Sequence, residues 1–154
     1  MGPTPVLRTL FAAGLALGLA ALTAPPAAAE FSGGGCGTRQ EIRSRAGVVY
    51  GTITACISGE ARRLRPDLVH GDAYVKLTRH VPGCKVKLWV GNWSDQKIHT
   101  EYEFACPKAD GVNRRFVLTP ISLPAGGYET GAKLWGTSFT SFAPTPYSLL
   151  LSVE

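Results

Sequence analysis

Two cysteines, Cys84 and Cys106, stand equally far from the polar triplet Ser94, Asp95 and Gln96. A disulfide-closed β-hairpin accounts for this symmetry, because strands paired around the triplet bring the two cysteines opposite each other. One face of that hairpin is apolar, with the opposed pairs Cys84 and Cys106, Val86 and Phe104, Leu88 and Tyr102, and Val90 and Thr100. The other face is mostly polar, with the pairs Lys85 and Ala105, Lys87 and Glu103, Trp89 and Glu101, Gly91 and His99, and Trp93 and Lys97. Since a slip of one residue would turn the apolar set outward, the pattern predicts this register.

The first 29 residues are typical of a secretory signal peptide. Arg8 precedes an apolar run over residues 10–22, and Ala27-Ala28-Ala29 forms a small-residue cleavage site before Glu30. The alternative is a retained membrane anchor, which needs about 20 apolar residues, more than this run contains. We therefore predict secretion to the extracellular space, with no membrane attachment after cleavage. The leader, rich in Ala, Gly and Pro, also suggests a bacterial protein from a high-GC genome.

All four cysteines lie beyond the leader, and the hairpin pair leaves Cys36 to bond with Cys56. An even number of cysteines in a small exported domain is typical of disulfides. A zinc site is the competing interpretation, but no C-x-x-C occurs, and His70, His80 and His99 are not spaced as ligands. We predict two disulfides, no metal and no other cofactor. In the chain-entropy estimate, a bridge that closes a loop of about 20 residues contributes roughly 3 kcal/mol.

Cleavage after Ala29 leaves 125 of the 154 residues, the size of one domain, and lowers the formal net charge from +5 to +4. Arginines cluster over residues 39–45 and 62–65, but no aromatic residues alternate with them as in single-strand nucleic-acid sites. We expect no nucleic-acid partner. Residues 30–46 are expected to form a flexible lead-in, from 30 to 35, and a first disulfide-tethered segment. Residues 47–154 should then form a monomeric β-sandwich domain.

The mature chain consists of β-rich segments separated by Gly, Pro, Asn and Asp, without an amphipathic helical pattern. Besides the two hairpin strands, we expect strands over residues 48–57, 68–77, 114–123, 127–136 and 146–153. Pro120 belongs at an edge or a bulge. Cys56 falls on the strand face opposite to Ile53 and Ile57, so that strand is either covered on both sides or contains a bulge. The prediction is an all-β domain, a single seven-stranded antiparallel sandwich with two disulfides.

The stretch LPAGGYETGAKLW, residues 123–135, places a Leu and a Gly-rich corner before Tyr128 at the start of a strand. This pattern resembles the tyrosine corner of immunoglobulin-like and fibronectin type III sandwiches, in which the Tyr hydroxyl bonds to upstream backbone. The resemblance implies that the strand of Tyr128 is strand F and that the hairpin supplies strands C and C′ of a C′-C-F-G sheet. The immunoglobulin Cys two residues after the Tyr is missing here, since Thr130 occupies that position.

Catalytic patterns are weak. No nucleophile elbow, H-E-x-x-H, Walker loop or dinucleotide fingerprint occurs. Glu101 and Glu103 share a strand face like a glycosidase pair, but an exposed hairpin face does not raise a carboxyl pKa. His70 and Asp72 also share a face, without an assignable nucleophile. We predict a protein that is not an enzyme, with no catalytic residues. The N-glycosylation sequon at residues 92–94 lies in a loop where Asn is expected in any case.

The three tryptophans are the candidate ligand-binding residues. Trp89 and Trp93 fall on the polar face of the hairpin, and Trp135 falls on the outward parity of strand F. Because strands C and F would be neighbours about 4.8 Å apart, the three indoles can share one exposed face. Such a face resembles the aromatic surface with which many carbohydrate-binding modules hold sugar rings. The alternative is that Lys97 covers Trp93 in a cation–π contact and that another segment buries Trp89.

The leading prediction of function is a small secreted, non-enzymatic β-sandwich that binds extracellular or cell-wall polysaccharide. The second is a module that binds an extracellular protein, such as a protease inhibitor, with the turn VPGC at residues 81–84 as its rigid exposed loop. A small hydrolase is the third.

Overall fold

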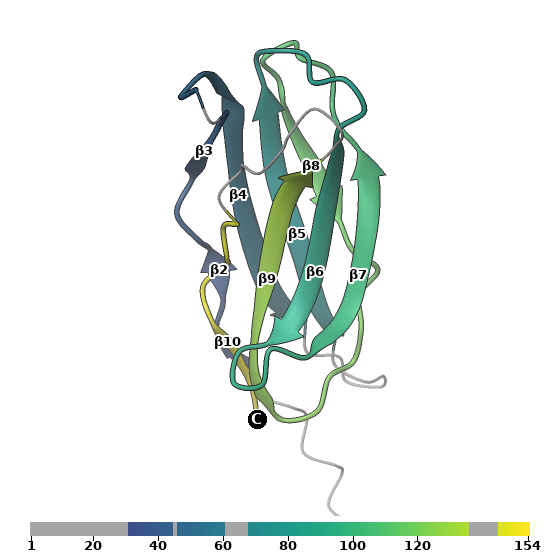
Figure 1. Cartoon of the computed structure of the whole chain (residues 1–154). Coiled ribbons are helices and arrows are strands. Elements are labelled where there is room, and N and C mark those ends of the chain that lie inside the picture. The colour runs from purple at the N-terminus through teal and green to yellow at the C-terminus, as the bar shows by residue number, and fades with distance from the viewer. Residues whose placement is uncertain (1–30, 45, 61–67, 136–144) are drawn as a thin grey trace, which may run out of the picture.

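The computed structural model describes residues 31–44, 46–60, 68–135 and 145–154. Within them, ten strands form two antiparallel five-stranded sheets that face each other across one apolar core (Figure 1). The all-β prediction is therefore confirmed, whereas the expected count of seven strands is wrong. No helix in this part of the chain is long and apolar enough to cross a membrane.

The first sheet has the order β1-β10-β9-β6-β7. Its members are β1 Phe31–Gly33, β10 Leu151–Val153, β9 Gly126–Trp135, β6 Lys85–Asn92 and β7 Ile98–Ala105. β6 lies between β7 and β9, so the two hairpin strands and the strand of Tyr128 are neighbours as expected. Val86, Leu88 and Val90 point from β6 into the core and are almost completely buried.

The second sheet has the order β2-β4-β5-β8, with β3 also paired to β4. Its members are β2 Gly35–Cys36, β3 Gln40–Arg43, β4 Val49–Glu60, β5 Leu68–Leu77 and β8 Asn113–Val117. β4 and β5 pair without a break from Gly51 opposite Leu77 to Glu60 opposite Leu68. Ile53 of β4 lies opposite Val75 of β5, and Ile57 lies opposite Gly71. These isoleucines and Val75 are almost completely buried, and they close the core against the first sheet.

The additional strands come from residues 31–43, part of which was expected to be a flexible lead-in. β1 pairs with β10 in the first sheet, whereas β2 pairs with β4 in the second. The chain crosses between the sheets at Gly33, Gly34 and Gly35, whose φ angles of 79°, 80° and 109° lie in the region that glycine adopts without strain. The glycines that suggested a loose segment thus make the crossing. Phe31 lies against the backbone of Gly59.

Two of the other expected strands are shorter than predicted. β8 ends at Val117, and Ile121 rejoins the sheet only through an isolated bridge to Val69. Pro120, which has no N–H to donate, lies in the interruption. β10 begins at Leu151, and upstream of it Tyr147 makes an isolated bridge to Gly131.

The hairpin register is confirmed from Lys85 opposite Ala105 to Val90 opposite Thr100. Beyond that point the register shifts, and Gly91 faces Ile98 instead of the predicted His99. The shift follows from the turn, in which the Asn92 N–H donates to the Lys97 carbonyl at 2.9 Å and Gln96 adopts a φ of 58°. The predicted pair of Trp93 and Lys97 is wrong for the same reason, because Trp93 belongs to this turn.

Both predicted disulfides are present, Cys36 with Cys56 and Cys84 with Cys106. Cys36 and Cys56 are directly opposed in the pairing of β2 with β4. β4 pairs regularly with β5 from Gly51 through Cys56, so no bulge separates Ile53 from Cys56. The register shift that β4 does contain lies between Val49 and Gly51, where it pairs with β3. Cys56 is 6% exposed although it faces away from Ile53, so β4 is covered on both sides at this point.

Tyr128 forms the expected corner. Its hydroxyl donates to the backbone carbonyl of Pro124 at 2.9 Å, and the side chain is 1% exposed. Burial of the ring raises the pKa of the Tyr128 hydroxyl above its usual value. Two residues further, Thr130 also faces the core, and its buried hydroxyl has no hydrogen-bond partner among the described residues.

Candidate functional site

The outer face of the first sheet carries the candidate ligand-binding residues. Along β6 and β9 the inward positions hold Leu88 and Leu134, so their neighbours Trp89 and Trp135 project outward. In register, Trp89 lies opposite Gly131 and Trp135 lies opposite Lys85. Four residues along a strand correspond to about 13 Å, so the two indoles occupy separate positions on one face. Trp93 comes directly after the end of β6, whereas Trp135 lies beside the start of that strand, so Trp89 stands between them.

Trp89 is largely covered, because two neighbours pack against its indole. Its indole lies across the backbone of Gly131, where a Cβ atom would overlap Cζ2 and Cε2 of the indole. Tyr147 meets the indole edge-on, with ring centroids 6.2 Å apart and planes at 84°. The C-terminal segment thus packs against Trp89, and the central tryptophan contributes to packing as well as to the surface.

Trp135 and Trp93 are more open, with 42% and 59% of their surfaces exposed. The Lys85 Nζ lies 5.7 Å from the centroid of the Trp135 ring. The cation–π contact on this face is therefore at Trp135, whereas the alternative considered from the sequence placed one between Lys97 and Trp93. The backbone of Trp93 is fixed, since its N–H donates to the Gly127 carbonyl at 3.0 Å and its carbonyl accepts from Gln96 Nε2 at 2.8 Å.

The sequon asparagine is part of the same turn. Asn92 Oδ1 accepts hydrogen bonds from the backbone N–H of Ser94 at 2.8 Å and from its hydroxyl at 2.7 Å. This Asx-type contact holds the turn that carries Trp93. The side chain of Asn92 therefore helps to fix the position of Trp93.

Charged residues flank the tryptophans on the β7 side. Lys87 Nζ lies 2.8 Å from Glu101 Oε2, and Lys85 Nζ lies 3.4 Å from Glu103 Oε2. The two carboxylates considered as a glycosidase pair are thus each in a solvent-accessible ion pair. Glu101 lies opposite Trp89 in register, so its ion pair with Lys87 stands beside that tryptophan.

The outer face of the first sheet around Trp89 and Trp135, together with Trp93 in the adjoining turn, is called the aromatic face below. Glu129 lies on it, and sequence reasoning missed this residue. It lies opposite Gly91 in register, between Trp89 and the turn of Trp93. Desolvation raises the pKa of its carboxyl, and no ion pair or hydrogen bond to it is found in the described part of the chain. Its outward parity on β9 was available in the sequence, but its neighbours follow only from the pairing of β6 with β9.

The remaining sequence candidates do not combine into a site. His70 Nε2 lies 3.1 Å from Glu60 Oε2, whereas Asp72 accepts from Arg115 Nε at 2.6 Å. The two residues therefore have separate partners. No group of three His, Cys, Asp or Glu side chains suited to a metal occurs among the described residues.

The VPGC turn is tight. Val81 is buried, the Cys84 N–H donates to the Val81 carbonyl at 3.4 Å, and Gly83 has a φ of 63°. Only Pro82 and Gly83 form the tip, so the turn is rigid but presents a small surface.

No protein-family model, curated protein or solved structure matches this chain.

Proposed function

We propose that this protein is exported with removal of residues 1–29 and that its mature domain binds extracellular or cell-wall polysaccharide without catalysing a reaction on it. The observation that carries the proposal is that Trp89 and Trp135 project from the outer face of one sheet, with the exposed Trp93 in the turn that follows β6. A sheet face with exposed aromatic rings suits stacking against sugar rings, because a sugar ring has an apolar face that can lie on the ring of a tryptophan.

Export is supported by the chemistry of the domain. Both cysteine pairs are disulfide-bonded, and such bonds persist in oxidising compartments. The leader before Glu30 has the layout of a cleaved signal peptide. Its composition favours a bacterial source.

We further propose that the domain is of the immunoglobulin-like, fibronectin type III class. The neighbour orders β7-β6-β9-β10 and β4-β5-β8 support this, since they correspond to the C′-C-F-G and A-B-E sheets of that class. The hydrogen bond from Tyr128 to Pro124 supports it as well. Fold alone carries no function, so the binding proposal rests on the aromatic face.

The first test is retention of the purified chain on a panel of insoluble polysaccharides. The chain is expressed with its leader in an exporting host, so that the disulfides form. We expect retention on at least one polysaccharide and release by soluble fragments of the same polymer. Absence of retention on neutral, acidic and amino-sugar polymers alike would contradict the proposal.

A further inference from the structure

A hollow opens on the outer face of the second sheet, on the opposite side of the domain from the tryptophans. It measures about 400 Å³, and its wall includes Cys36, Arg39, Thr52, Thr54, Tyr74 and Asn113. A second hollow of about 200 Å³ shares Arg39, Thr52 and Asn113 with the first and adds Lys76. The two hollows thus form one depression, of a volume typical of sites for small ligands.

The pairing of three strands assembles this depression. Thr52 of β4 lies opposite Lys76 of β5, which lies opposite Asn113 of β8. In the next outward row Thr54 lies opposite Tyr74. Because the buried residues of β4 and β5 alternate with these, the polar side chains all reach the outer face.

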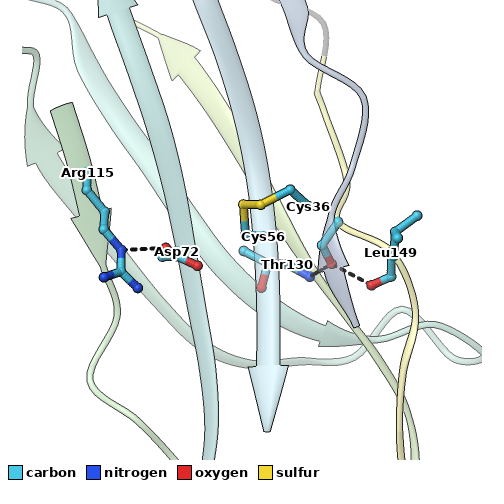
Figure 2. The surroundings of a disulfide bond; sticks show 7 residues. Cys36, Cys56, Asp72, Arg115, Thr130 and Leu149 are labelled. Atoms are coloured by element: carbon cyan, nitrogen blue, oxygen red, sulfur yellow. Dashed lines mark hydrogen bonds and ion pairs between the residues drawn. A yellow bond between two sulfur atoms is a disulfide. The ribbon is translucent and has the colours of Figure 1, made fainter. Parts of the chain in front are cut away.

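The Cys36–Cys56 disulfide sets one wall. It fixes β2 beside β4, and the chain then continues through Gly37, whose N–H donates to the Ala55 carbonyl at 2.9 Å, toward Arg39. Figure 2 shows the bridge between the neighbouring strands, with Asp72 on the other side of β4 pointing toward Arg115. Arg39 is therefore brought to the depression by a covalent restraint.

The charges around the depression leave two cations unpaired. Three nearby acidic residues already have arginine partners: Glu41 with Arg43, Asp72 with Arg115 and Asp110 with Arg114. In contrast, the described residues provide no ion pair to Arg39 or Lys76, although both line the depression and both are exposed. The local excess of charge is positive.

We propose that this depression binds the carboxylate of an acidic sugar. Arg39 and Lys76 contact the carboxylate, as guanidinium and ammonium groups do in charge-assisted hydrogen bonds. Thr52, Thr54 and Asn113 provide hydroxyl and amide groups for the hydroxyls of the sugar ring. A lining with two cations and several neutral polar groups suits a ligand of low charge with many hydroxyls. This site is separate from the aromatic face, and the proposal does not depend on whether that face binds polysaccharide.

The test is isothermal titration of the full purified chain with a galacturonic acid trisaccharide and with the neutral galactose trisaccharide. We expect binding of the acidic sugar only, and weaker binding at high salt because exposed charges are screened. Arg39→Gln and Lys76→Gln should each raise the Kd on the order of tenfold, as expected for loss of one charged hydrogen bond. Both side chains are exposed, so the variants should keep the melting temperature of the native chain.

Lys133→Gln is the matched control, because it removes the same charge from an exposed position on the first sheet. It should leave the Kd unchanged. Equal weakening by Lys133→Gln, equal affinity for the neutral sugar, or equal competition by inorganic sulfate would overturn the assignment. Trp93→Ala and Trp135→Ala should keep the affinity for the acidic trisaccharide. This result distinguishes a failure of the proposal for the depression from a failure of the proposal for the aromatic face.

Discussion

The indole of Trp89 lies across the backbone of Gly131, its partner in register on the neighbouring strand. Only a residue without a Cβ atom leaves room for this contact, since a Cβ on Gly131 would overlap the indole. Tyr147 covers the edge of the same ring. The central tryptophan of the aromatic face is therefore held by two elements besides its own strand.

Gly131→Ala should displace the Trp89 indole and lower the free energy of unfolding by about 1–3 kcal/mol, the usual cost of overpacking. Gly127→Ala is the matched control on the same strand and face, because its Cβ would meet only the flexible end of Leu150 at 3.3 Å. Urea unfolding followed by tryptophan fluorescence measures both. Equal losses for the two variants would contradict the packing of Trp89 on Gly131.

Thr130→Val should stabilise the domain. The Thr130 hydroxyl is buried without a hydrogen-bond partner among the described residues, and an unsatisfied buried polar group costs about 1–3 kcal/mol. Valine keeps the branched shape and removes that cost, so we expect a gain of about 1 kcal/mol in urea unfolding. A loss of stability would show that the hydroxyl does have a hydrogen-bond partner.

Glu129→Gln should raise stability at neutral pH and not at low pH. Desolvation raises the pKa of Glu129, so the native state binds the proton more tightly than the unfolded state does. Native stability consequently falls as pH rises from the ordinary pKa of glutamate through the raised value. Glu129→Gln removes the partly buried negative charge and with it this loss of stability. Its advantage in melting temperature should appear above that window and vanish below it, and a constant difference at every pH would contradict the prediction.

N-terminal sequencing of the exported protein should begin at Glu30. Ala27-Ala28-Ala29 supplies the small residues that signal peptidases require, and Phe31 is already paired within the sheet. A start at Met1 would contradict both the predicted leader and the compartment inferred from it.

The hairpin, both disulfides and the tyrosine corner were predictable because each depends on local spacing. Alternation along 84–106 fixes the buried face, and four cysteines leave one partner for Cys36 once the hairpin is closed. The turn was less predictable, since the shift at Gly91 depends on the side chain of Asn92 and on the conformation of Gln96. Alternation also suggested a buried Tyr102, but it is 61% exposed because β7 is an edge strand.

The candidate sites were predictable only in part. The outward parity of Trp89 and Trp135 follows from alternation, but the cover that Tyr147 gives Trp89 comes from a segment distant in sequence. The depression on the second sheet was missed, because it requires Arg39 to lie beside Thr52, and β2 and β3 were not expected as strands. The alternation of residues along a strand predicts which face of the sheet each side chain occupies. Which side chains lie next to one another depends on the order of strands in the sheet, and the alternation does not give that order.

The most direct test of the proposal for the aromatic face uses a variant that combines Trp93→Ala and Trp135→Ala. Its retention is measured on the polysaccharide that binds the native chain. Each exposed indole should contribute about 0.5–1.5 kcal/mol to stacking, so the combined change should weaken retention about fivefold to over a hundredfold. The melting temperature should remain nearly unchanged, because both side chains are exposed. Tyr102→Ala is the control, an exposed aromatic residue at the sheet edge and off this face, and it should retain native binding. Unchanged retention in the combined variant, or equal loss in the Tyr102 variant, would contradict the proposal that this face binds polysaccharide.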